Sequence, residues 1–284
     1  MTVSCRFSEF LSPPLALLLV AAVSIVTLPS AAAADVAVTT CGQEVVDDVA
    51  VMSGDLDCSS YPGVALILHR SVLRMNGFTI TSNLANSDGS SPGQGVPAVE
   101  CEKTCRILGP GTITGAGGGG LNGAGCCSTA ALAGERVTAR RLTLEDNGGT
   151  GAVARNLKLR SCTIRNNAGY GVLHIYRTTV VDTVIENNGL HGVLGMNAAG
   201  SLYLRSSTVS ANGAQGVLAS NMILRNSTID GNGTNPAACL GPVVNAEPCV
   251  DLYHNSGSID ASGLTCGTSF DLPLDQPTGL CSGD

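Results

Sequence analysis

Four side chains with acid–base or anion-binding chemistry fall close together in the middle of this 284-residue chain. Tyr170 and His191 each stand directly before a glycine in two similar segments, and His174 and Arg177 follow Tyr170 closely. A tyrosine, a histidine and an arginine on one surface supply an acid, a base and a carboxylate clamp, as β-elimination or C5 epimerisation of uronic acids requires. The simpler interpretation is that these are ordinary corner and surface residues.

Arginines form a second group, because they recur at one place in a repeated pattern. Each stands four residues before an aliphatic residue, and Val181 takes this place in one copy. The stretch from Arg136 to Arg225 holds ten basic and four acidic side chains, an excess of six, in a chain whose net charge is −7. Such segregation predicts an anion-binding surface, and the alternative is a solvated strand face. The predicted binding column consists of Arg140, Arg160, Arg205 and Arg225.

These residues belong to segments that repeat every 20 to 24 residues. CTIRNNAGYGV (from Cys162) and TVIENNGLHGV (from Thr183) superimpose without gaps. A period of this length marks a solenoid, and alternating apolar and polar residues indicate short strands. We therefore expect an all-β fold, a single-stranded right-handed parallel β-helix of short coils of about 20–24 residues. The aliphatic anchors of five successive copies are Leu144, Ile164, Ile185, Val209 and Ile229.

An asparagine stands three residues after each of these five anchors, and after Ile80 in a weaker copy of the repeat. Asparagine tolerates a left-handed corner and can hydrogen-bond to a neighbouring turn, so stacked copies predict a side-chain ladder along the solenoid. The asparagines at this place are Asn83, Asn147, Asn167, Asn188, Asn212 and Asn232.

The chain resembles the right-handed parallel β-helix repeat proteins of the pectin-lyase-like superfamily. The repeats carry this resemblance, with MNGFTI (Met75–Ile80) and GPGTITG (Gly109–Gly115), over about Asp55 to Asn232. It implies the fold and a preference for polysaccharides laid along the outer sheets, but no single activity. The NTD, GHG and RIK motifs of polygalacturonase-like members do not occur in the sequence, nor does the aspartate–proline–histidine motif of alginate epimerases.

The first residues predict export. The apolar run Leu15–Leu28, followed by Ala31–Ala34, is typical of a secretory signal that is cleaved before Asp35. The run is short for a bilayer, and no later segment reaches the roughly 18 apolar residues of a spanning helix, so we expect no transmembrane segment and a secreted, cell-surface or periplasmic protein. The expected divisions are a signal peptide (1–34), an amino-terminal cap (35–60), the β-helix (61–233), and disulfide-containing carboxy-terminal coils and cap (234–284).

Twelve cysteines suit an oxidising compartment. Cys126 and Cys127 are adjacent, so they either form a vicinal disulfide that leaves Cys162 unpaired, or one of them pairs with Cys162. The other candidate pairs are Cys41 with Cys58, Cys101 with Cys105, Cys239 with Cys249, and Cys266 with Cys281.

Composition narrows the partners. Four scattered histidines and five methionines give no metal site, and we expect no cofactor. A pI near 5.0 and few aromatic residues argue against nucleic-acid binding. We also expect the protein to be a monomer. Glycosylation sequons at Asn226 and Asn232 matter only in a eukaryotic host.

The expected function is non-catalytic binding of an acidic polysaccharide on an outer sheet face, and the alternative is a polysaccharide lyase or C5 epimerase acting on uronates.

Overall fold

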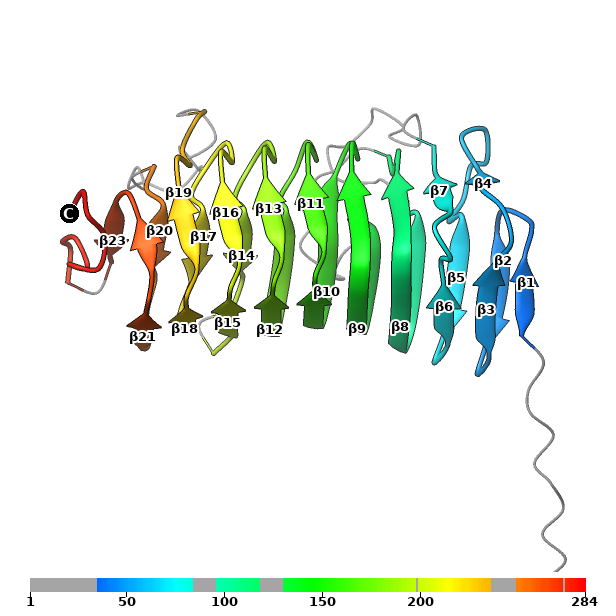
Figure 1. The fold of residues 1–284 in the computed structure, drawn as a ribbon, viewed down its shortest axis with the longest axis horizontal. Helices are drawn as coiled ribbons and strands as arrows, with labels where there is room; N and C mark the ends of the chain where they lie inside the picture. Colours follow the sequence, from blue (N-terminus) through cyan, green and yellow to red (C-terminus); the bar gives the residue numbers. More distant parts are fainter. Residues whose placement is uncertain (1–34, 84–95, 118–129, 198, 236–248, 273) are drawn as a thin grey trace, which may run out of the picture. The chain divides into compact units, whose positions relative to one another are not determined.

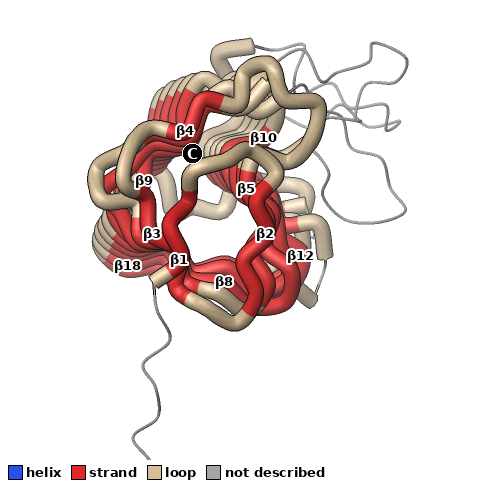
Figure 2. Tube along the Cα trace, turned by 90° about the vertical axis from the view of Figure 1, so that its right-hand side faces the viewer, coloured by secondary structure: helices blue, strands red, loops and turns tan. Residues whose placement is uncertain are grey.

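A computed structural model describes residues 35–83, 96–117, 130–197, 199–235, 249–272 and 274–284. Parallel strands wind into a β-helix, and successive coils lie side by side along its length (Figure 1). Viewed down the long axis of the solenoid, the strands of successive coils stack around a common interior (Figure 2). Each full coil visits three faces, which we name A, B and C in chain order. The predicted all-β solenoid is confirmed.

The strands are short, as the repeat length requires, and four of them bend around a corner. Strands β8 (Val99–Thr114) and β9 (Ala130–Glu145) run through all three faces, and β10 (Thr150–Arg160) and β12 (Val172–Val181) run through faces A and B. The other strands of face A are β2 (Gln43–Val46), β5 (Leu66–His69), β14 (Val193–Gly195), β17 (Val217–Ala219), β20 (Leu252–His254) and β23 (Ser269–Asp271).

The remaining strands belong to faces B and C. Face B adds β1 (Val36–Val38), β3 (Val49–Met52), β6 (Val72–Arg74), β15 (Ser201–Arg205), β18 (Asn221–Arg225) and β21 (Ile259–Ser262). Face C adds β4 (Leu56–Asp57), β7 (Thr79–Thr81), β11 (Thr163–Arg165), β13 (Val184–Glu186), β16 (Thr208–Ser210), β19 (Thr228–Asp230) and β22 (Thr265–Cys266).

The aliphatic anchors set the register of the coils. A three-residue strand persists only because it pairs with the coil on either side, and burial of the anchors fixes which residues pair. Ile164 pairs with Leu144 and with Ile185, and the same column continues through Val209 to Ile229. All five side chains are fully buried. The predicted register is therefore confirmed.

The asparagine ladder is present in the interior. Nδ2 of Asn167 donates to Oδ1 of Asn188 at 2.9 Å, and Asn188 donates to Asn212 at 2.9 Å. The column runs from Asn147 to Asn232, whose Nδ2 donates to Oδ1 of Asp251 at 2.9 Å. A carboxylate can only accept, so Asp251 ends the ladder and uses its second oxygen to accept the amides of Gly267 and Thr268.

The ladder asparagines do not themselves make the left-handed corner. Left-handed backbone occurs one residue earlier, at Asp146, Asn166, Asn187 and Ala211, with φ between 53° and 55°. The corner residue turns the chain, which leaves the following asparagine free to point inward and hydrogen-bond. The prediction placed both roles on one residue, and that part of it was wrong.

Disulfides join Cys41 to Cys58, Cys101 to Cys105 and Cys266 to Cys281, as predicted. Cys249 is also disulfide-bonded, and its candidate partner Cys239 lies outside the described residues. Cys162 is a free, buried thiol, so the interpretation that pairs it with Cys126 or Cys127 was wrong. Cys126 and Cys127 themselves lie outside the described residues.

Candidate functional site

Face B presents an ordered grid of outward side chains. Its strands alternate, so that in β10 Leu157 and Leu159 enter the core while Asn156, Lys158 and Arg160 point out. Each strand of this face therefore offers a first, a middle and a last outward position, and parallel register stacks each position along the solenoid. In the last position, neighbouring strands β9, β10, β12, β15 and β18 carry Arg140, Arg160, Val181, Arg205 and Arg225.

The other two positions add more cations. Arg136 and Arg177 flank Asn156 in the first position, and Arg106 and Lys158 flank Thr138 in the middle position. No outward position of face B from Thr104 to Arg225 holds an acidic residue, and the first one after it is Asp260 in β21. We call this surface the basic face, and it consists of Arg106, Arg136, Arg140, Lys158, Arg160, Arg177, Arg205 and Arg225.

Most cations of the basic face are available to a ligand. Arg160 is 57% exposed and meets Asp182 only loosely, with 4.0 Å between Nε and Oδ2. Arg225 differs, because its guanidinium pairs with the Asp260 carboxylate and donates to the Asp260 carbonyl at 2.8 Å. Among the described residues no ion pair engages Arg140 or Arg205. The predicted column is therefore in register, with Arg225 partly neutralised at its end.

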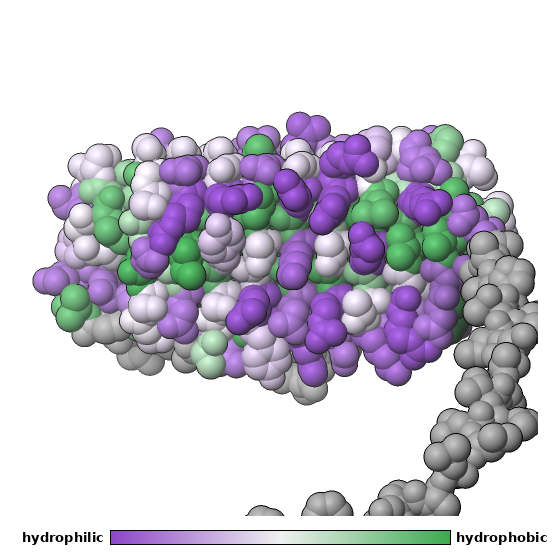
Figure 3. Space-filling model, turned by 60° about the horizontal axis from the view of Figure 1, so that its bottom comes forward, coloured by the Kyte–Doolittle hydropathy of each residue, from purple (hydrophilic) through white to green (hydrophobic). Residues whose placement is uncertain are grey.

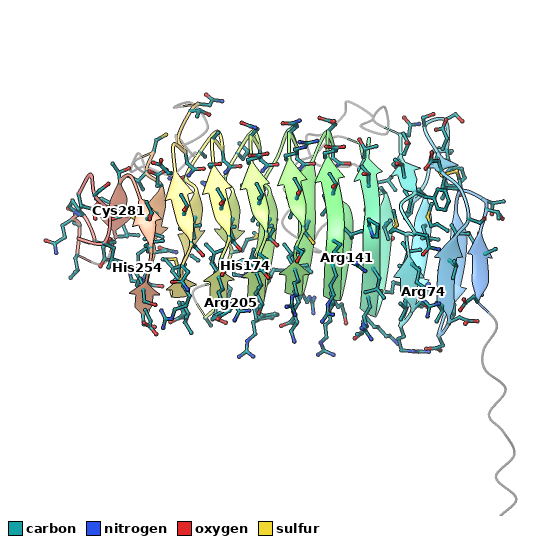
Figure 4. The ribbon with its side chains drawn as sticks, viewed as in Figure 1. Arg74, Arg141, His174, Arg205, His254 and Cys281 are labelled. Carbon is teal, nitrogen blue, oxygen red and sulfur yellow. A yellow bond between two sulfur atoms is a disulfide. The ribbon has the colours of Figure 1, made fainter. Side chains whose placement is uncertain are left out.

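The basic face is visible from below the solenoid. Hydrophilic side chains stand in rows along this side, with paler and apolar side chains between them (Figure 3). Figure 4 shows long side chains projecting from the lower edge, where Arg205 is labelled. Regular spacing and exposed charge make this surface suited to a long, repetitive anion.

Tyr170 and His191 lie in one column on adjacent coils, as predicted. Their rings stack with centroids 5.4 Å apart and an interplanar angle of 2°. Tyr170 packs against Val153 and Leu173, which face outward on face A in a cluster separate from the interior core. Burial raises the pKa of Tyr170 and lowers the pKa of His191 to about 4. Both rings are therefore neutral near pH 7, and the pKa of neither is close to neutrality.

His174 and Arg177 do not join this stack. His174 lies two residues after the inward Val172 and is itself fully buried, with its side chain between the strand layers (Figure 4). Burial lowers the pKa of His174 to about 4, and neither ring nitrogen has a hydrogen-bond partner in the described structure. Arg177 points outward from face B. Alternation along β12 thus separates residues that are close in sequence, and the expectation of an outward His174 was wrong.

The coils bring together several polar residues that were not predicted from the sequence. Lys158, Arg136 and Arg106 join the basic face, and counting back by twos from each predicted arginine would have found the first two. On face A, His69 lies between two carboxylates, with 2.8 Å from Nε2 to Glu44 and 2.8 Å from Nδ1 to Glu102. No clear repeat marks the coils of this second cluster, so the sequence offers no signal for it.

Burial and the nearby carboxylate of Glu102 raise the pKa of Glu100, while His69 opposes this shift.

Across the described ranges, His, Cys, Asp and Glu side chains form no group of three or more that could hold a metal ion. The same ranges contain no helix that is long and apolar enough to span a bilayer.

Comparison with known proteins identifies a family. The family model described as a right handed beta helix region matches residues 65–232 and 154–256. Two solved structures of Azotobacter vinelandii mannuronan C-5 epimerases are also similar. The AlgE4 A-module is 13% identical, covers 78% of this chain and 85% of its own, and has a TM-score of 0.28. The AlgE6 A-module is 12% identical, covers 78% and 84%, and has the same TM-score of 0.28. No curated protein matches.

Proposed function

Because the chain belongs to the right-handed β-helix family, whose fold serves many activities, we propose that it binds an acidic polysaccharide on the basic face without catalysing a reaction. The observation that carries this proposal is the parallel register of Arg140, Arg160, Val181 and Arg205. Because these residues recur with the repeat, the parallel register places them side by side on successive coils, in a line of charges along the solenoid.

The spacing of the line favours a polymer. Adjacent coils are about 4.8 Å apart, so Arg160 and Arg205, two coils apart, are separated by roughly 10 Å along the solenoid. An extended chain of acidic sugars repeats at about the spacing of one coil. Every second sugar of a chain that lies along the solenoid can therefore meet an arginine, first Arg160 and then Arg205. A guanidinium binds a carboxylate or sulfate through two parallel hydrogen bonds, which favours arginine over lysine at such positions.

The candidate catalytic residues favour binding over chemistry. Tyr170 and His191 stack on face A, His174 is buried inside, and Arg177 belongs to the basic face. A general base needs to reach the proton that it abstracts and to have a pKa near the working pH. Of these candidates only Arg177 belongs to the basic face, so no candidate base lies beside it. We keep the lyase or epimerase only as the alternative, of which the experiment below tests the lyase.

An exported protein would meet such a polymer outside the cell. The disulfides at Cys41–Cys58 and Cys266–Cys281 suit an oxidising compartment, in agreement with the secretory signal proposed for residues 1–34.

The test is a binding panel with the mature protein. Polygalacturonate, alginate and a sulfated glycan are compared with a neutral glucan at low and moderate salt, and the absorbance of unsaturated products is followed. We expect the acidic polymers alone to bind, more weakly as salt rises, and no product to accumulate. Equal binding of the neutral glucan, or no binding at low salt, contradicts the proposal, and formation of unsaturated product establishes the lyase instead.

A further inference from the structure

The centre of the basic face has a gap in its long side chains. In the middle position, Thr179 of β12 stands between Lys158 of β10 and Tyr203 of β15. In the last position, Val181 stands between Arg160 and Arg205, and only 8% of Val181 is exposed. Two adjacent short side chains thus form a floor between two rows of long ones. The two rows are two coils apart, roughly 10 Å.

The gap has chemically different walls. Tyr203 supplies an aromatic ring, and such a ring offers an apolar face with a polar tip, which suits a sugar that is apolar on its C–H face and polar at its edge. Lys158 and Arg160 supply cations on the opposite side. Arg177 lies in the first position of the same strand as the floor, so a third cation stands at one end of the gap.

The other end of the gap carries a carboxylate. Asp182 follows Val181 at the left-handed corner, where it is 46% exposed. Its charge opposes a further acidic group at that end, where Arg160 and Arg205 already meet the neighbouring sugars, whereas Arg177 attracts one at the opposite end. A bound acidic sugar therefore has one favoured orientation along the strand, with its carboxylate toward Arg177.

We propose that the gap over Thr179 and Val181 is a subsite for one acidic sugar ring, which stacks on Tyr203 and directs its carboxylate to Arg177. The neighbouring sugars along the solenoid then meet Arg160 and Arg205. This inference rests on the proposed function, and it adds that the protein recognises the sugar ring as well as the charge.

Three variants separate ring recognition from charge. Tyr203→Leu removes the aromatic face, Tyr203→Phe retains it, and Thr179→Arg fills the gap while adding a cation. Each variant is titrated with a galacturonate oligomer and with inorganic polyphosphate, which has the charge but no sugar ring. Melting curves confirm that each variant is folded.

We expect Tyr203→Leu and Thr179→Arg to weaken oligomer binding roughly five- to tenfold, and Tyr203→Phe to bind within about twofold of wild type. For polyphosphate we expect no effect of Tyr203→Leu and tighter binding by Thr179→Arg, because only charge acts there. Tighter binding of both probes by Thr179→Arg, with Tyr203→Leu neutral, overturns the subsite and leaves charge recognition intact. Binding of neither probe by the wild type overturns the proposed function together with the subsite.

Discussion

The most unusual single residue is His174, a neutral imidazole inside a solenoid core. Burial lowers its pKa to about 4, compared with 6.5 in an unfolded chain. The unfolded chain therefore binds a proton at a higher pH than the folded protein does. The titration of His174 therefore leaves stability unchanged well above pH 6.5 and lowers it as the pH falls from 6.5 toward 4.

The His174→Leu variant tests this linkage. We expect it to be at least as stable as wild type at pH 7, because leucine fills a similar volume and leaves no unpartnered nitrogen. Between pH 7 and 4.5 it should lose about 2 to 3 kcal/mol less unfolding free energy than wild type. Urea unfolding over this pH range measures the difference. A His174→Gln control removes the titration but keeps buried polar atoms, so it should share the shallower pH dependence without the gain at pH 7.

At the scale of elements, the asparagine ladder holds the coils in register. Asn188 accepts from Asn167 and donates to Asn212, and its Nδ2 also donates to the Ile164 carbonyl at 3.3 Å. Replacing Asn188 by aspartate would keep the accepting role and place a carboxylate against the Asn212 oxygen. We expect Asn188→Asp to lower the unfolding free energy by about 2–4 kcal/mol, as a buried unpaired polar group does.

The neighbouring residue supplies a matched control for the ladder. Asn187 is exposed and left-handed, and Asp146 occupies the equivalent place in another coil. Asn187→Asp makes the same chemical change outside the ladder, and it should alter stability by less than about 0.5 kcal/mol. Equal losses for the two variants, measured by urea unfolding, would show that the ladder adds nothing beyond the corner itself.

The repeated elements were predictable from sequence, and the exceptions have physical causes. Ile185 and Asn188 follow the 20- to 24-residue period, so their columns could be read directly. His174 was not predicted to be inside, because histidine is intermediate between buried and exposed residue types and its type alone does not place it in a core. A matching signal stands one coil later, where a Cβ at Gly195 would come within 2.9 Å of His174 Nε2. Gly195 leaves the space that the imidazole of His174 occupies, but neither residue by itself predicts a buried histidine.

The candidate site was predictable in part for the same reason. Arg160 and Arg205 follow the period of the anchors, whereas Lys158 and Tyr203 are recognised only once alternation within each strand is counted. The cluster around His69 depends on the pairing of β2, β5 and β8, and these coils do not repeat the motif that reveals register.

At the scale of the molecule, disulfides secure both ends of the solenoid. Cys41–Cys58 and Cys266–Cys281 lie in the coils nearest the two ends of the described fold, where unpaired strand edges would otherwise fray. Each closes a loop of 15 to 17 residues, and in the chain-entropy model such a loop contributes about 3 kcal/mol. We expect reductant to lower the melting temperature clearly, and unchanged melting under reducing conditions would contradict this role.

Acidic and basic residues are also segregated along the chain. Residues 35–135 hold ten acidic and four basic side chains, and residues 226–284 hold seven acidic and none basic. In sequence, the part of the basic face from Arg136 to Arg225 therefore lies between two acidic regions. This arrangement focuses a positive potential on the middle coils, where we propose that an anionic polymer binds.

The most direct test of the account is the affinity of a galacturonate polymer for two charge-matched double variants at low salt. Arg160→Gln with Arg205→Gln removes two cations from the basic face. Arg70→Gln with Arg165→Gln removes two from elsewhere, and these are similarly exposed, at 49% and 45%. Each cation contributes on the order of 1 kcal/mol, so the first variant should bind roughly tenfold or more weakly, while the second should bind like wild type. Equal affinities of the two variants would show that the basic face is only solvated surface.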